Sequence, residues 1–494
     1  GKQRVTFETT PKMSTYLVFF GVGEFEFSID KKDDRVRVVT LPGMQEFSNF
    51  GADLGRKSLE FSESYYGIAY PLPKMDLIAI PDFAFGAMEN WGAITFRENL
   101  LLHYPEVTSK SGEERIFEVI AHEIAHQWFG NLVTPSDWRY LWLNESFATF
   151  FGFGVVNHYC PEWDTWQQFL YSMTGPALNR DALNETFAIE IPGGEHVVIN
   201  ASTAPIIYNK GGSILRQIQG YIGEENFKSG LRHYLKTFEY DCATSQDLWQ
   251  SFETVTQQPI SELMKSWIEQ PGYPLITVSR RKGRLKLHQH RFTYLSDESA
   301  QIWMIPVTIH LFTATGESRV LSVLMDESEK EIDVDDDVVA YKVNDRQTGF
   351  YGVKYDDANN LFELGRRVQA KSISPEDRWG LQNDFYALVK CGDVGLGDYL
   401  DFLSHYQQED AYLPLVSIAD NLYAAYLVMD DRNRTRISSM AAPWFESILH
   451  EIGFEPVKAE KHTRSLLRDK YLWAAACWGS ESALEFARSR FRAL

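Results

Sequence analysis

The sequence predicts a multidomain α+β protein in which a mixed α/β domain, a small β-sandwich and an all-helical, solenoid-like domain follow one another. The chain has 494 residues, which is more than one hydrophobic core normally organises. Its hydrophobic spacing changes from helical to alternating at Pro271–Pro274 and returns to a period of 3.6 near residue 358. These two changes, together with the strand-like residues 4–27 at the start of the chain, predict four segments, at 1–27, 28–270, 271–353 and 354–494.

The first segment is predicted to contain strands. Residues 4–27 are rich in β-forming residues and are divided by the turn residues Pro11 and Lys12. The second segment opens with short strands and a helix near Leu54–Tyr66. Two further strands are expected at 77–83 and 92–102.

Helices dominate the rest of the second segment. A helix over Glu113–Phe129 is predicted by Ser111, which suits an N-cap, and by Gly130, which suits a helix stop. A second helix is expected at Asn144–Tyr159. Further helices are predicted at 161–175, 204–222, 224–239, 245–256 and 260–269.

The last two segments differ in their hydrophobic period. From 275 to about 353, alternating β-branched residues predict the short strands of a β-sandwich. Ser374 and Pro375 form a helix start with proline at the first helical position, and helices are predicted to the end of the chain.

The composition narrows the class of protein. Lys and Arg total 48 and Asp and Glu total 68, so the formal net charge is −20. This charge argues against general nucleic-acid binding, which needs a basic surface, and no apolar run reaches membrane-spanning length. The four cysteines show no CxxC spacing and predict buried free thiols in a reducing, cytoplasmic compartment, although three Asn-X-Ser/Thr triplets point weakly the other way.

His122-Glu-Ile-Ala-His126 is the strongest chemical motif of the chain. Residues i and i+4 share one face of a helix, so both imidazoles can bind one ion. Glu145 follows 19 positions after His126, at the start of the next predicted helix, and a loop of that length can return its carboxylate to the first helix. Two histidines and one glutamate leave the fourth position of a catalytic zinc open for water. The sequence therefore predicts one Zn²⁺ per chain, bound by His122, His126 and Glu145.

Three other features are candidates for the chemistry around this metal. Glu123 lies between the histidines and can accept a proton from the metal-bound water. The segment Gly86–Asn90 is an extended stretch that can pair with a peptide backbone, and its Glu89 can hold a free α-ammonium, although a solvated loop glutamate is an equally good interpretation. Tyr208 can donate a hydrogen bond to an oxyanion, although a core tyrosine is the simpler interpretation of that residue alone.

Four motifs in order resemble the aminopeptidase N family of zinc exopeptidases. They are GAMENWG, HEIAHQWFG, LWLNES and the YxKG sequence that begins at Tyr208. The spacing is most similar to the archaeal tricorn-interacting and the cytosolic puromycin-sensitive aminopeptidases. The resemblance implies a thermolysin-like catalytic domain at 28–270, the last strands of a mostly missing N-terminal β domain at 1–27, and a shortened helical domain at 354–494.

The resemblance also implies a role for each matching residue. His122, His126 and Glu145 are implied as zinc ligands and Glu123 as the general base. Glu89 is implied to bind the α-amine of a peptide substrate with a free N-terminus, and Tyr208 to stabilise the transition state. Gly86, Ala87 and Met88 are implied to lie along the substrate.

Other readings of the sequence remain. A thermolysin-like endopeptidase shares the zinc helix, an epoxide-hydrolysing branch belongs to the same family, and a fragment that binds peptides without catalysis would keep the same motifs. His288 and His290 would share one face of a strand, but a third ligand for a second metal is not evident.

Overall fold

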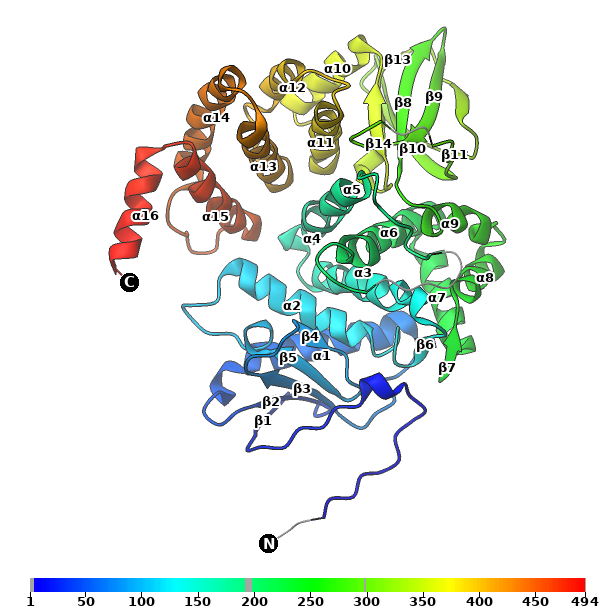
Figure 1. The fold of residues 1–494 in the computed structure, drawn as a ribbon, viewed down its shortest axis with the longest axis vertical. Coiled ribbons are helices and arrows are strands. Elements are labelled where there is room, and N and C mark those ends of the chain that lie inside the picture. Colours follow the sequence, from blue (N-terminus) through cyan, green and yellow to red (C-terminus); the bar gives the residue numbers. More distant parts are fainter. Residues whose placement is uncertain (1–3, 192–197, 297–298, 494) are drawn as a thin grey trace. The chain divides into compact units, whose positions relative to one another are not determined.

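The structure is a computed structural model that describes residues 4–191, 198–296 and 299–493 (Figure 1). The chain divides into two compact units. Unit 1 comprises Gly1–Tyr159 and Glu190–Met264, and unit 2 comprises Cys160–Ile189 and Lys265–Leu494. Unit 2 therefore includes a short segment from the middle of the sequence as well as the strands and helices of the C-terminal half. Within the described ranges, no helix combines the length and the apolar character needed to cross a lipid bilayer.

Unit 1 contains a five-stranded mixed sheet with the order β1-β2-β3-β5-β4. The strands β2, β3 and β5 are parallel, and the edge strands β1 and β4 run antiparallel to their neighbours. Five consecutive residues of β3 are buried, so both faces of the sheet are covered at its centre. The strands are β1 at Glu26–Ile29, β2 at Val36–Thr40, β3 at Met75–Ile80, β4 at Ala87–Met88 and β5 at Ala93–Arg97.

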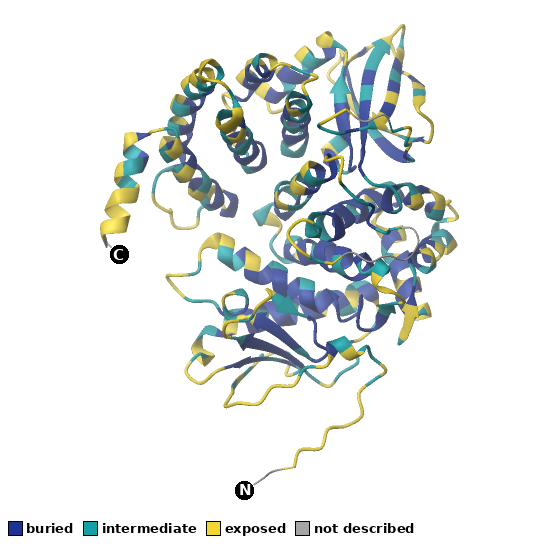
Figure 2. Cartoon of the chain, in the orientation of Figure 1, coloured by how far each residue is buried: buried dark blue, intermediate teal, exposed yellow. Residues whose placement is uncertain are grey.

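The helices of unit 1 bury the centre of that unit. Helix α2 packs against both α1 and α3, and α3 also contacts α6. Helix α3 is apolar around most of its circumference and buried along most of its length (Figure 2), as expected for a core helix. The helices are α1 at Asn49–Tyr66, α2 at Lys110–Ala125, α3 at Trp142–Tyr159, α6 at Gly211–Ile222, α7 at Glu224–Thr237, α8 at Ser245–Thr256 and α9 at Ile260–Ile268, whose last residues enter unit 2; β6 at Val133–Pro135 pairs with β7 at Asp241–Ala243.

The strands of unit 2 form two small sheets, with the orders β11-β10-β13 and β12-β9-β8-β14. All neighbours are antiparallel except β14 and β8. Two sheets are what the predicted β-sandwich requires. The strands are β8 at Pro274–Arg281, β9 at Arg284–Arg291, β10 at Ile305–Thr313, β11 at Ser318–Met325, β12 at Glu329–Asp333, β13 at Val338–Val343 and β14 at Gly352–Tyr355.

Helices make up the remainder of unit 2. Helix α11 begins as predicted, because the Ser374 side chain accepts a hydrogen bond from the backbone N–H of Asp377 and Pro375 occupies the first turn. The helices are α4 at Thr165–Phe169, α5 at Gly175–Asp181, α10 at Ala358–Gln369, α11 at Pro375–Cys391, α12 at Leu396–Phe402, α13 at Tyr412–Val428, α14 at Asp431–Ile452, α15 at His462–Cys477 and α16 at Glu481–Ala493; a π-helical segment, Leu170–Thr174, joins α4 to α5.

The strands predicted over 4–27 are wrong for almost all of that segment. Residues 4–25 carry no strand and contain only a 3₁₀ turn at Thr15–Leu17, and β1 begins at Glu26. A strand needs a neighbour to satisfy its backbone groups, and in the described part of the chain no strand pairs with 4–25. A composition rich in β-forming residues is therefore not sufficient to form strands in residues 4–25.

Two details of the predicted helix over Glu113–Phe129 also differ. The N-cap is Ser109, whose side chain accepts from the N–H of Gly112, and Ser111 lies inside the helix. The helix ends at Ala125, before Gly130. Gly130 is nevertheless required, because it has φ of +126° and a Cβ there would lie 2.9 Å from Nδ2 of Asn144.

The expected burial of the cysteines is also wrong. All four cysteines lie in the described residues, and none is buried or joined in a disulfide: Cys160 and Cys391 are partly exposed, and Cys242 and Cys477 are exposed. Three of them lie at or just after a helix end and Cys242 lies in the short strand β7, and the small apolar area of a thiol is not enough to draw these positions into a core.

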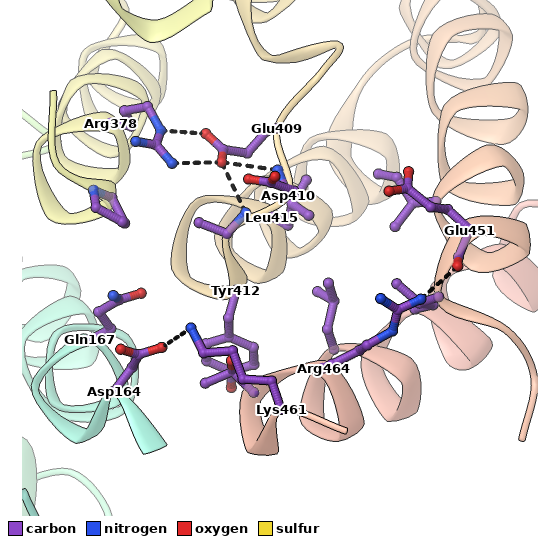
Figure 3. Close-up of a pocket in the computed structure, with 16 residues that line it drawn as sticks. Asp164, Gln167, Arg378, Glu409, Asp410, Tyr412, Leu415, Glu451, Lys461 and Arg464 are labelled. Atoms are coloured by element: carbon purple, nitrogen blue, oxygen red, sulfur yellow. Dashed lines mark hydrogen bonds and ion pairs between the residues drawn. The ribbon is translucent and has the colours of Figure 1, made fainter. Parts of the chain in front are cut away.

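A cavity of about 450 Å³ in unit 2 is bordered by a buried ion pair (Figure 3). Arg378 donates to Glu409 through Nε at 2.6 Å and through a terminal nitrogen at 2.8 Å, and the two side chains are 5% and 1% exposed. Glu409→Ala is expected to destabilise the folded chain by about 3–5 kcal/mol, because it leaves the guanidinium buried without its counter-charge. The measurement is the shift in the midpoint of thermal unfolding.

Asp410 offers a matched control beside the same cavity. It pairs with Lys371 at 2.7 Å, but its side chain is 65% exposed. Asp410→Ala is therefore expected to change stability by less than about 1 kcal/mol. Equal losses in the two variants would show that burial of the Arg378 pair is not what stabilises this region.

Candidate metal centre

The two predicted histidine ligands meet at the C-terminal end of α2. His122 lies in the last turn of α2, and His126 directly follows Ala125, the last helical residue. Their Nε2 atoms are 3.2 Å apart. Nδ1 of His126 lies 3.1 Å from the carbonyl oxygen of Phe129. Because a carbonyl only accepts, Nδ1 donates this hydrogen bond, which leaves Nε2 as the nitrogen that can bind a metal once it has lost its proton.

Glu145 reaches the same point from the first turn of α3. Its Oε2 lies 3.5 Å from Nε2 of His122 and 3.4 Å from Nε2 of His126. Close packing of α3 on α2 permits this approach, since α3 carries Gly152 where the helices touch. A Cβ at Gly152 would lie 3.2 Å from the carbonyl oxygen of Glu118, so a larger residue would press the helices apart.

This donor set fits a zinc ion. Tetrahedral bonds of about 2.0–2.1 Å place zinc ligands about 3.3 Å apart, and the observed separations are 3.2, 3.4 and 3.5 Å. Burial alone would lower the pKa of His126, but Glu89 and Glu145 outweigh it and raise that pKa to about 10. Burial alone would raise the pKa of Glu145, but His126 and His122 lower it to about 2. The potential at this point is therefore negative and favours a bound cation.

Glu123 projects into the same cluster. Its carboxylate, that of Glu89 and a ring nitrogen of His126 lie within 4.8 Å of one another. Glu123 is 6% exposed, and its Oε2 is buried with no hydrogen-bond partner among the described residues. Burial, reinforced by Glu89 and Glu145, raises the pKa of Glu123 well above its ordinary value. Once it is ionised, a carboxylate whose acceptor oxygen has no partner among the described residues can take a proton from water.

The Gly86–Asn90 segment brings a second carboxylate beside the ligands. Ala87 and Met88 form β4, which pairs with β5 and is the last strand of its sheet. Among the described residues no strand pairs with its other edge, which could accept an added peptide strand. Glu89 follows β4 and is 7% exposed. Its carbonyl oxygen accepts from Nδ2 of Asn131 at 2.9 Å and from Nε2 of Gln127 at 3.3 Å. These two bonds attach Glu89 to the loop that leaves the histidine helix.

Tyr208 lies in a π-helical segment, Pro205–Lys210, that leads into α6. Its ring is parallel to that of His122, with an interplanar angle of 10° and centroids 6.2 Å apart. Burial, followed by the charge of Glu145 and a hydrogen bond to it, raises the pKa of Tyr208 above its ordinary value, so the hydroxyl keeps its proton. π-helical turns are frequent at functional sites, and this one places a proton donor beside the metal ligands.

The approach of Tyr208 depends on α3. Oγ of Ser146, the residue after Glu145, donates to the carbonyl oxygen of Ile207 at 2.7 Å. A Cβ at Gly211 would lie 1.8 Å from that same Oγ, so only glycine permits this contact. The two residues hold the π-helical segment against α3, the helix that carries the predicted ligand Glu145.

Tyr16 is a site residue that the sequence did not predict. It lies in the 3₁₀ turn at Thr15–Leu17, and its hydroxyl donates to Oε1 of Glu89 at 3.2 Å. Because 73 positions separate the two residues, spacing along the chain carries no signal for this contact.

Two other groups of histidine and carboxylate side chains do not support a second metal site. His288 and His290 are exposed on β9 with ring centroids 5.8 Å apart, and no third ligand joins them in the described ranges. His310, Asp345 and Asp377 are close enough to hold an ion. However, the buried ammonium of Lys342 lies 3.3 Å from Asp377 and already supplies a cation there.

Comparison with known proteins identifies families that match two parts of the chain. The family model described as the peptidase family M1 domain matches residues 50–267, and that of an ERAP1-like C-terminal domain matches 340–494. The chain is 41% identical over 436 residues to tricorn protease-interacting factor F2 of Thermoplasma acidophilum, covering 87% of this chain and 53% of the relative. It is 40% identical over 432 residues to probable aminopeptidase 2 of Sulfurisphaera tokodaii (87% and 54%) and 36% identical over 508 residues to aminopeptidase M1 of Arabidopsis thaliana (99% and 57%). The chain thus spans about half the length of these curated relatives.

Proposed function

This chain belongs to peptidase family M1 through its domain at residues 50–267, and from that membership we propose that it is a zinc-dependent aminopeptidase that removes the N-terminal residue of peptides. One observation carries the step from hydrolase to aminopeptidase. The carboxylate of Glu89 lies in the same cluster as Glu123 and His126, with ligand atoms within 4.8 Å of one another. A carboxylate there can hold an α-ammonium only when the first peptide bond lies at the metal ligands.

The zinc would be held by His122, His126 and Glu145. When bound, zinc supplies Lewis acidity, which polarises a peptide carbonyl and acidifies water. Glu123 accepts the proton of the attacking water and returns it to the leaving amine. Its Oε2, which has no hydrogen-bond partner among the described residues, is available for this transfer. The Tyr208 hydroxyl donates a hydrogen bond to the oxyanion that develops on the substrate.

Binding of the substrate uses the edge of the sheet. The free edge of β4, with Gly86 before it and Ala87 and Met88 within it, would pair with the peptide backbone in an extended form. Glu89 ends this strand and would bind the ammonium group. The first residue would therefore be fixed at both its amine and its carbonyl.

A free α-amine is expected to be essential for turnover. The zinc-loaded chain should hydrolyse aminoacyl arylamides and unblocked peptides, whereas N-acetylated versions should react at least about 10²-fold more slowly in kcat/KM. Acetylation removes the positive charge that Glu89 would bind and leaves this buried carboxylate without that counter-charge. The measurement is kcat/KM for matched free and acetylated substrates, with a chelator-treated sample as the control.

Each alternative is distinguished by that assay together with a peptide-binding measurement and an epoxide substrate. An endopeptidase would cleave acetylated peptides at internal bonds as fast as free ones. A peptide-binding fragment without catalysis would bind zinc and peptide but show no turnover, and a member of the epoxide-hydrolysing branch would turn over an epoxide. Cleavage that depends on zinc and on a free amine supports the aminopeptidase alone.

A further inference from the structure

We propose that Tyr16 is a positioning residue that orients the Glu89 carboxylate toward the α-ammonium of the substrate. This inference rests on the proposed function and extends it to a residue outside the four recognised motifs. Tyr16 lies in unit 1 together with the site.

The Tyr16 hydroxyl joins two parts of the site. It donates to Oε1 of Glu89 at 3.2 Å and accepts from Nδ2 of Asn144 at 3.4 Å. Asn144 directly precedes Glu145 on α3, so the hydroxyl connects the proposed amine-binding carboxylate to the helix that carries a metal ligand. In a peptide, covalent bonds fix the distance between the α-amine and the first carbonyl. If the carboxylate holds the amine about 1 Å from its productive position, the rate can fall about 10²-fold.

The turn that carries Tyr16 is itself held in place. Leu17 is 1% exposed, and its carbonyl oxygen accepts from Nδ2 of Asn90 at 3.3 Å. The Tyr16 ring packs edge-on against Trp138 with centroids 5.6 Å apart. Because Asn90 follows Glu89, the turn and the carboxylate are attached to the same short segment. Tyr16 therefore keeps its position without a strand or long helix around it.

Tyrosine suits this position because it is a neutral donor. Lysine or arginine at the same place would neutralise Glu89 and compete with the substrate ammonium. One hydrogen bond to Oε1 leaves acceptor sites on the carboxylate for the substrate, since a carboxylate offers about four. Burial, reinforced by the charge of Glu89, raises the pKa of Tyr16 far above neutrality, so the hydroxyl remains a donor.

The test compares two zinc-binding ligands that differ only in the α-amine: an α-amino hydroxamate and its des-amino analogue. Their dissociation constants are measured by calorimetry on the zinc-loaded chain. Wild type is expected to prefer the amino compound. Tyr16→Phe is expected to reduce this preference roughly tenfold or more and to leave the affinity for the des-amino compound unchanged. Tyr221→Phe, a half-buried tyrosine on α6, serves as the matched control and should keep the wild-type ratio.

A double-mutant cycle identifies the residue through which Tyr16 acts. In a Glu89→Gln background, Tyr16→Phe should change the ratio by less than about twofold, because the charged partner is already absent. An unchanged ratio in Tyr16→Phe alone, or the same loss in both backgrounds, overturns the role of Tyr16 while the aminopeptidase function stands. If wild type itself shows no preference for the amine, the proposed function fails first. Melting curves of each variant show whether a lost preference for the amine comes from unfolding. If Tyr16→Phe does not fold, a folded Tyr16→Trp variant, which cannot place a hydroxyl at Glu89, should show the same loss of preference.

Discussion

Glu123→Gln is expected to lower kcat by a factor of about 10²–10⁴ without loss of zinc. Glutamine keeps the size of the side chain but cannot accept the proton that the attacking water must lose. The Oε2 atom of Glu123 is buried and has no partner among the described residues, so it is available for that proton. Glu123 is not one of the three residues whose ligand atoms meet at the predicted metal position. Steady-state kinetics on an aminoacyl arylamide and metal analysis of the same sample measure the two parts of this prediction.

The matched control is Glu113→Gln on the first turn of the same helix. Glu113 pairs with the exposed Lys110 at 2.7 Å and with His103 at 3.4 Å, outside the predicted metal centre, so its loss should leave kcat within about twofold. A Glu123→Gln chain that binds zinc and retains more than about a tenth of the wild-type kcat would exclude Glu123 as the base. A variant that has lost its zinc would instead show that the carboxylate contributes to metal binding.

Glu145→Ala is expected to abolish stoichiometric zinc binding and, with it, activity. The ligand atoms of His122, His126 and Glu145 are 3.2–3.5 Å apart, and removal of one leaves two neutral nitrogens for a doubly charged ion. The variant also removes negative charge that raises the pKa of His126, so the remaining histidines bind a cation less well. Metal analysis after gel filtration should give about one zinc per chain for wild type and well below one for the variant.

Glu225→Ala, an exposed glutamate on α7, is the control and should retain both zinc and activity. Activity that returns when excess zinc is added to Glu145→Ala would agree with weakened binding. A full zinc content in Glu145→Ala would contradict the ligand assignment, whatever the activity.

Local sequence patterns predicted the helix boundaries that depend on interactions within one helical turn. Helix α11 begins at the predicted Ser374-Pro375, because capping depends on residues within one turn. Helix α8 has the predicted bounds Ser245–Thr256 for the same reason, with Thr244 and Asp247 forming a capping box. The strands expected over 4–25 do not form, because a strand depends on a partner that no local pattern supplies.

The sequence by itself predicted the three candidate metal ligands, and only the tertiary structure showed that they come together and which side chains surround them. The spacing of His122 and His126 on one helix face is a local property, and so the ring nitrogens meet as expected. Glu145 needed a close contact of α3 with α2, for which Gly152 leaves room. The contact between Tyr16 and Glu89 crosses 73 positions and depends on a turn without regular structure. Such a hydrogen bond is set by packing of distant segments, and packing leaves no periodic trace in the sequence.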